Sequence, residues 1–119
     1  MTKHLTLRTG TTATGAVLEL AGELDHHTAA EVRAALAELE LRAGQQLVLD
    51  LAGVTCCDSS GITVLIAARN HALAADATIA LAAVPERVCR IFRLVGLEQV
   101  FPVHPSAQAA EDAWHPSSS

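Results

Sequence analysis

Residues 47–68 read LVLDLAGVTCCDSSGITVLIAA, and this stretch decides the fold. Leu47–Leu51 is almost wholly apolar, which is typical of a strand in a sheet that helices cover. The polar segment Asp58-Ser59-Ser60-Gly61 follows, and apolar residues then surround most of the helix predicted over Ile62–Ala75. Asp58 stands where a capping residue of that helix would be. A buried strand, a short polar junction and a deeply packed helix form one repeating unit of an α/β fold.

The N-terminal side predicts a hairpin. His4–Arg8 alternates apolar and polar residues, as a half-buried strand does, and Thr9–Thr12 is turn material. Gly15–Leu20 starts a second extended segment. We therefore expect two antiparallel strands at the start of the chain.

A helix should follow the hairpin. Val32, Leu36 and Leu39 share one helical face, which predicts a helix over His27–Arg42. Asp25 and Thr28 are alternative caps for it, and Gly44 is a stop signal.

The C-terminal side adds two strands and two helices. Thr78–Val84 and the short Val100–His104 are the predicted strands. Pro85 suits the first position of a helix that ends at Gly96, and Ser106 suits the cap of a short helix to Trp114. The predicted order β-β-α-β-α-β-α-β-α implies a mixed, mostly parallel sheet of about five strands, with the hairpin as its antiparallel edge and about four helices. We expect one domain over residues 1–114 and a loose tail over 115–119.

Composition excludes several classes of protein. The chain has 119 residues, only eight of them Lys or Arg, and a formal net charge of −5, which opposes binding to nucleic acid. No apolar run approaches the ~20 residues that span a bilayer, and the N-terminus lacks the apolar stretch of a signal peptide. Three cysteines do not make a disulfide framework. We therefore expect a cytoplasmic protein that does not bind membranes.

Chemistry in an open α/β sheet gathers where strands feed helices. Two such junctions carry polar residues, Gly22–His27 and Thr55–Gly61. In the second junction, we expect Ser59 and Ser60 to be exposed at the start of a helix, where unpaired N–H groups and the helix dipole favour an added phosphate. A phosphoserine there would be tolerated by its own domain but would repel a partner docked over it. The capping role of Asp58 alone is the simpler interpretation of the same tetrapeptide.

Three motifs together resemble a known family. They are Gly22–Thr28, the segment from Leu49-Asp50-Leu51 to Asp58-Ser59-Ser60-Gly61-Ile62, and Arg90-Ile91-Phe92 with Gly96-Leu97. In spacing and order they resemble the STAS domains of bacterial anti-sigma-factor antagonists of the sporulation and general-stress type, over about His4–His104. Cys56-Cys57 and Thr63 depart from the family's common pattern, and Thr63 could alter which kinase docks.

The resemblance implies a partner-switching protein rather than an enzyme, without a cofactor. The unphosphorylated form would bind an anti-sigma factor that is also a serine kinase, and so free a sigma factor. Phosphorylation of Ser59 would block that binding, and a PP2C-type phosphatase would reverse it. The partner-binding residues it implies are Asp25, His26, Asp58, Ser59, Ser60, Gly61, Ile62 and Thr63. We expect a monomer.

Rival interpretations draw on the same residues. A serine hydrolase would need His26 or His27 as a base for Ser59, but the Gly-x-Ser-x-Gly elbow is absent. Adjacent Cys56 and Cys57 cannot easily ligate one zinc ion, and Cys89 completes no metal-binding spacing, so we expect reduced thiols and no metal. Asp50 should face outward or meet backbone N–H groups. The three arginines of the third helix should form a solvated face; they are Arg87, Arg90 and Arg93.

A last alternative keeps the fold and changes the partner. Similar STAS domains serve as subunits of lipid-transport ATPases or of stress-sensing complexes, without phosphorylation. The Gly22–Thr28 segment favours the sigma-regulatory branch.

Overall fold

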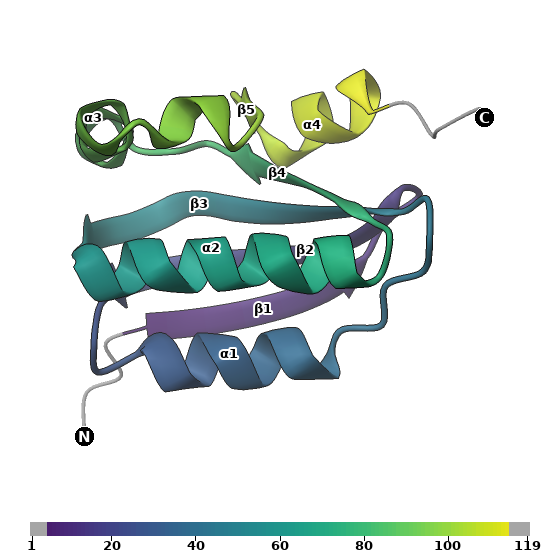
Figure 1. Ribbon diagram of the computed structural model, residues 1–119, viewed down its shortest axis with the longest axis horizontal. Coiled ribbons are helices and arrows are strands. Elements are labelled where there is room, and N and C mark those ends of the chain that lie inside the picture. Colours follow the sequence, from purple (N-terminus) through teal and green to yellow (C-terminus); the bar gives the residue numbers. More distant parts are fainter. Residues whose placement is uncertain (1–4, 115–119) are drawn as a thin grey trace.

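The computed structural model describes residues 5–114 and shows one sheet with helices on both of its faces (Figure 1). The strands are β1 (Leu5–Thr11), β2 (Gly15–Leu24), β3 (Gln46–Cys57), β4 (Thr78–Ala82) and β5 (Val103–His104). The helices are α1 (Ala29–Glu38), α2 (Ser59–Ala74), α3 (Glu86–Val95) and α4 (Ala107–Ala113), with a 3-10 turn η1 (Leu97–Gln99). The strands lie in the order β1-β2-β3-β4-β5, with β1 antiparallel to β2 and the rest parallel. The predicted mixed α/β sheet with an opening hairpin is confirmed.

The alternation of side chains along β3 explains why the sheet is covered on both faces. Leu47, Leu49 and Leu51 belong to a large core cluster together with residues of α1, α2 and α3. Val48 points to the opposite face and packs in a smaller cluster with Ala110 of α4. Figure 1 shows α2 lying between α1 and α3, so the first residues of α2 have a helix on either side.

Both elements of the 47–68 stretch are longer than predicted. β3 continues to Cys57, because its end pairs with the end of β2. α2 begins at Ser59 rather than at Ile62, because Asp58 is the residue that caps it. The polar junction between strand and helix is therefore Asp58 alone, and Ser59 is the first helical residue.

The helix predicted over His27–Arg42 is shorter at both ends. α1 starts after Thr28 and ends at Glu38, with Leu39 already extended. Leu39 and Leu41 both pack against the core, and a spacing of two residues suits an extended chain rather than a helix. Gly44, with a φ of 83°, lies in the loop that leads to β3 and not at the end of the helix.

Boundaries elsewhere also differ from the predictions: β2 continues to Leu24 and β4 ends at Ala82. β1 continues to Thr11, so most of the predicted turn Thr9–Thr12 is strand that pairs with β2. The turn itself follows Thr11. Pro85 is the residue before α3 rather than its first residue. The strand predicted from Val100 starts only at Val103, because the Val100 N–H bonds back to Leu97 O and buried Phe101 turns into the core. Gly96 and Ser106 end α3 and cap α4 as predicted, and the predicted tail at 115–119 lies outside the described residues.

Candidate functional site

The two polar junctions identified in the sequence lie side by side. β2 and β3 are parallel, and their last residues, Leu24 and Cys57, are paired. The Asp58 N–H donates to Leu24 O across the junction at 3.3 Å. Asp25 and Asp58, the residues after each strand, therefore begin their turns at the same edge of the sheet, as expected for parallel strands.

Gly61 fixes how closely α2 approaches this edge. It is buried in the first turn of the helix. A Cβ atom at this position would overlap Leu24 O and would lie 2.8 Å from Cys57 Sγ. Any side chain here would push the first turn of α2, and Ser59 with it, away from the sheet.

Asp58 holds the first turn of α2 with one carboxylate oxygen. Its Oδ1 accepts hydrogen bonds from the N–H groups of Ser60 and Gly61, at 2.8 Å and 3.1 Å. The predicted cap is confirmed. The expectation that unpaired N–H groups here would favour a phosphate is corrected for these two groups, because the carboxylate of Asp58 already occupies them.

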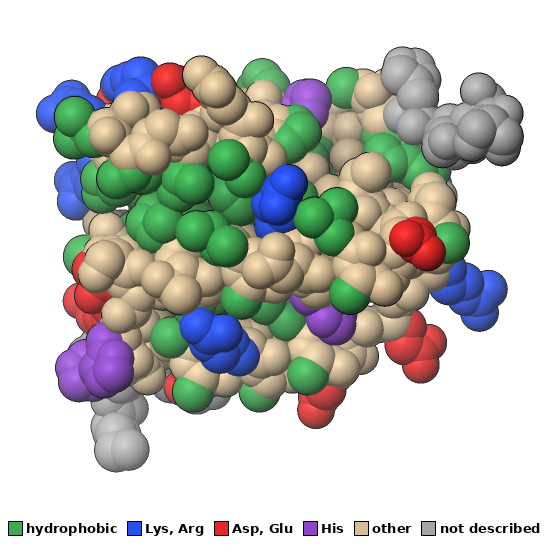
Figure 2. All heavy atoms as spheres, viewed as in Figure 1, with side chains coloured by type: hydrophobic (Ala, Val, Ile, Leu, Met, Phe, Trp, Pro, Cys, Tyr) green, Lys and Arg blue, Asp and Glu red, His purple; other side chains and the backbone are tan. Residues whose placement is uncertain are grey.

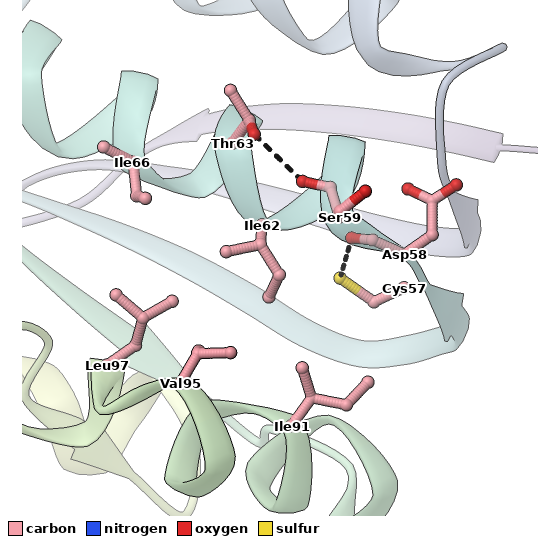
Figure 3. A pocket seen from close by; sticks show the side chains of 9 residues that line it. All are labelled: Cys57, Asp58, Ser59, Ile62, Thr63, Ile66, Ile91, Val95 and Leu97. Carbon is pink, nitrogen blue, oxygen red and sulfur yellow. Dashed lines mark hydrogen bonds between the residues drawn. The ribbon is translucent and has the colours of Figure 1, made fainter.

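Ser59 and Ser60 differ in exposure. Ser59 is exposed, and its hydroxyl makes no hydrogen bond within the described residues, whereas Ser60 is half-buried. The Thr63 hydroxyl donates to the backbone oxygen of Ser59 at 2.9 Å, one helical turn on (Figure 3). The Ser59 side chain is thus free on the surface while its backbone is held in the helix.

An open hollow of about 510 Å³ lies between α2 and α3, and we call it the apolar groove. Its lining residues are Cys57, Asp58, Ser59, Ile62, Thr63, Ile66, Ile91, Val95 and Leu97. In Figure 3 Ile62 and Ile66 on α2 face Ile91, Val95 and Leu97 across it. Figure 2 shows hydrophobic side chains gathered on this part of the surface, with basic side chains nearby. Ser59 stands at one end of the groove.

A second hollow, of about 340 Å³, lies between α1 and α2 on the other side of the same helical turn. It is lined by His26, Ala29, Ala30, Arg33, Ser60 and Thr63, and we call it the basic groove. Thr63 lines both grooves, whereas Ser59 lines only the apolar groove and Ser60 only the basic groove. The first turn of α2 is therefore a ridge with one serine toward each side. The sequence motif did not predict this separation.

The first junction is also braced by its own side chains. Asp25 Oδ1 accepts from the N–H groups of His27 and Thr28, at 2.9 Å and 3.2 Å. Thr28 occupies the N-cap position of α1, but its hydroxyl donates to Glu23 O rather than capping the helix. His26 and His27 are exposed, with their rings edge to face at 5.7 Å.

The cysteines are separate free thiols within the described residues. Cys56 is exposed and Cys57 is buried. Burial, followed by the charges of Asp58 and Cys56, raises the pKa of the Cys57 thiol from 9.0 to about 12. Among residues 5–114 no three His, Cys, Asp or Glu side chains form a group that could hold a metal ion.

Two other polar predictions are met outside the site. Asp50 Oδ1 accepts from the Ala52 N–H at 3.0 Å, as expected for a residue that meets neighbouring backbone. The arginines of α3 are exposed: Arg87 donates to Thr55 O at 3.0 Å and Arg93 pairs with Glu86 at 3.1 Å.

Comparison with known proteins identifies the family. A family model described as "Mlab, STAS domain" matches residues 7–103. An anti-sigma-B factor antagonist of Listeria monocytogenes is 30% identical over 84 residues, which is 71% of this chain and 74% of that protein. The chain therefore belongs to the STAS domain family, and its curated relatives include anti-sigma factor antagonists.

Solved structures agree on the fold. An anti-sigma factor antagonist from Mycobacterium paratuberculosis superposes with a TM-score of 0.74 at 24% identity, covering 92% of each chain. The Bacillus cell fate determinant SpoIIAA in its phosphorylated form superposes with a TM-score of 0.64 at 20% identity, covering 90% of this chain and 97% of that one. Within residues 5–114 no helix has the length and apolar character to cross a membrane.

Proposed function

We propose that this chain is a cytoplasmic anti-sigma factor antagonist whose binding is switched off by phosphorylation of Ser59. The observation that carries the proposal is the position of Ser59: its hydroxyl is exposed at the first residue of α2 and at the end of the apolar groove. A kinase can reach that oxygen without unfolding the domain. The relatives' names, and the phosphorylated form of a protein with the same fold, support this choice.

A phosphate on Ser59 would act on binding and leave the fold intact. It adds about −1.5 to −2 charges at neutral pH. The site is the N-terminal end of a 16-residue helix, where a negative charge is tolerated. A partner covering the apolar groove would have to bury that charge beside the carboxylate of Asp58, against Ile62 and other apolar side chains. Repulsion and the cost of desolvation both oppose such a complex.

The two serines are not equivalent in this scheme. A phosphate on Ser60 would lie in the groove that holds Arg33 and His26, where positive charge can offset it. A phosphate on Ser59 would lie toward the apolar groove, which has no basic side chain in its lining. We therefore assign the switch to Ser59.

The partners follow from this mechanism. The unphosphorylated chain would bind an anti-sigma factor that is also a serine kinase, and a PP2C-type phosphatase would restore binding. The contact surface would include Asp25, His26, Asp58 and the first turn of α2, namely Ser59, Ser60, Gly61, Ile62 and Thr63. The chain would act as a monomer and by binding alone, with no catalytic residues, metal or cofactor of its own.

The test is a labelling experiment with a matched pair of serine variants. The purified chain is incubated with ATP and each candidate anti-sigma kinase, and the phosphate is located by mass spectrometry. Ser59→Ala should abolish labelling and Ser60→Ala should retain it. Ser59→Asp should weaken binding to the kinase that labels the wild type, with an unchanged circular dichroism spectrum. Phosphate on Ser60 alone, or equal kinase binding by Ser59→Asp and wild type, would refute the proposal.

The matched family model, whose description includes the name Mlab, keeps a second candidate in view. In that alternative the chain is a STAS subunit of a lipid-transport ATPase or of a stress-sensing complex, and the grooves beside α2 hold a permanent partner. Such a chain would never be labelled on Ser59 and would co-purify with a transport ATPase. The labelling experiment separates the two functions.

A further inference from the structure

We propose that the basic groove receives a carboxylate side chain of the anti-sigma partner, as a second contact on the far side of the α2 ridge. This inference rests on the proposed function, because it assigns the chemistry of that partner. The groove lies between α1 and α2, and Arg33 supplies its permanent positive charge. His26 also lies in its lining.

Arg33 is a cation without an assigned role in the domain. Its side chain is exposed and makes no ion pair within residues 5–114. The two carboxylates of the adjoining turns are committed elsewhere: Asp25 accepts backbone N–H groups of its own turn, and Asp58 accepts those of Ser60 and Gly61. In a chain of net charge −5, an unpaired cation in a hollow beside the switch residue is suited to a negative group from outside.

The ridge geometry connects this groove to the docking surface. Thr63 lines both grooves, so the two hollows are separated only by the first turns of α2. A partner that covers Ser59 and continues across this ridge meets Arg33 and His26 next. The partner surface that fits is therefore an apolar side chain for the apolar groove, with an Asp or Glu placed to cross α2 into the basic groove.

Charge complementarity at such a rim acts mainly on the rate of association and on its salt dependence. The contact would be exposed, and screening would weaken it at high ionic strength. A free anion is a poorer occupant, because the lining holds only one permanent cation and two hydroxyl-bearing residues, Ser60 and Thr63. The neighbouring apolar groove suits a protein side chain and not a small ion.

The test uses Arg33→Glu with Arg42→Glu as its matched control. Both arginines are exposed, but Arg42 lies in the loop before β3 and lines neither groove. The probe is the purified kinase that labels Ser59, and the dissociation and association rate constants are measured at 50 and 300 mM salt. Arg33→Glu should weaken binding about tenfold at low salt, chiefly through slower association, and Arg42→Glu should change it less than about twofold. The weakening should shrink at high salt.

A charge-swap experiment tests directly whether Arg33 contacts a carboxylate of the partner. One Asp→Arg or Glu→Arg substitution on the kinase should restore binding to Arg33→Glu while weakening binding to the wild type. If Arg33→Glu and Arg42→Glu bind equally well, yet Ser59→Asp still loses the kinase, the inference is wrong and the proposed function stands. If no kinase labels or binds the wild type, both the inference and the proposed function are wrong. Binding of inorganic phosphate that depends on Arg33, with no effect of Arg33→Glu on the kinase, would also overturn the inference.

Discussion

Gly61 sets the position of the first turn of α2 from inside the domain. Its backbone packs directly on Leu24 O and on Cys57 Sγ, at the ends of two parallel strands. This contact holds the first turn of α2 against the sheet, so that Ser59 is presented on a firm support. A residue with no side chain thus determines where the exposed hydroxyl lies.

Replacing Gly61 with alanine should therefore destabilise the protein. The added methyl group cannot be accommodated without moving α2 or β2, and overpacking of this kind costs about 1–3 kcal/mol. We expect a lower midpoint of urea unfolding for Gly61→Ala and slower labelling of Ser59. Gly10→Ala is the control. Gly10 is exposed, and its added methyl group would meet only Val17 Cγ1, at 3.3 Å, so this substitution should cost much less. Equal midpoints for the two variants would show that the close contact at Gly61 does not matter.

For single residues, the sequence predicts the helix cap and the exposed serine better than it predicts packing contacts. Asp58 as a cap and Ser59 as an exposed residue could both be predicted, because capping and helix-terminus chemistry are local. The packing role of Gly61 depends on Leu24, which is far away in the sequence, so local reasoning could not find it. A weak signal exists, since glycine is a poor helix former and stands here inside the first turn of a helix.

The apolar groove is a property of two elements, α2 and α3, and not of either alone. Val88, Ile91, Phe92 and Val95 are spaced in the sequence so that they share one side of α3. Only Val88 and Phe92 of this set are buried, while Ile91 and Val95 line the groove, with Val95 58% exposed. Periodicity identifies an apolar side but does not say what covers it. The groove could therefore not be predicted from the sequence, and neither could the full length of β3, whose last residues are held by pairing with β2.

We predict that polar substitutions in the groove weaken partner binding and spare the fold. Ile66 on α2 is 36% exposed and Val95 on α3 is 58% exposed, so Ile66→Gln with Val95→Gln should change stability little. Loss of two apolar contacts at the centre of an interface should lower affinity for the kinase at least about tenfold.

Two apolar residues of the same helices serve as the control. Leu73 and Leu94 are 47% and 81% exposed but lie outside the groove. The pair Leu73→Gln with Leu94→Gln should bind the kinase as the wild type does, as measured by calorimetry. If this pair loses as much affinity as the groove pair, general surface hydrophobicity and not the groove determines binding.

The stability of the whole molecule should depend on alkaline pH through one buried thiol. Burial raises the pKa of Cys57 from 9.0 to about 12. Between these values the unfolded chain releases this proton while the folded chain retains it, so the unfolded state binds fewer protons. The free energy of unfolding should therefore fall as the pH rises from about 9 toward 12.

Urea unfolding at a series of alkaline pH values tests this prediction. Cys57→Ala should show a shallower fall in the free energy of unfolding over that range than the wild type. Cys56→Ser, which changes the exposed neighbouring thiol, should keep the steep fall. Parallel curves for Cys57→Ala and the wild type would rule out Cys57 as the cause.

The two hydrogen bonds that one carboxylate oxygen of Asp58 accepts have a consequence for the proposed phosphorylation of Ser59, namely for how the phosphate would be removed. Because the N–H groups of Ser60 and Gly61 already donate to Asp58, a phosphate on Ser59 would not be held by these two groups and would extend into water. A phosphatase could then reach the phosphorus atom without unfolding the first turn of α2. Reversal would be limited by encounter with the enzyme and not by any rearrangement of the substrate.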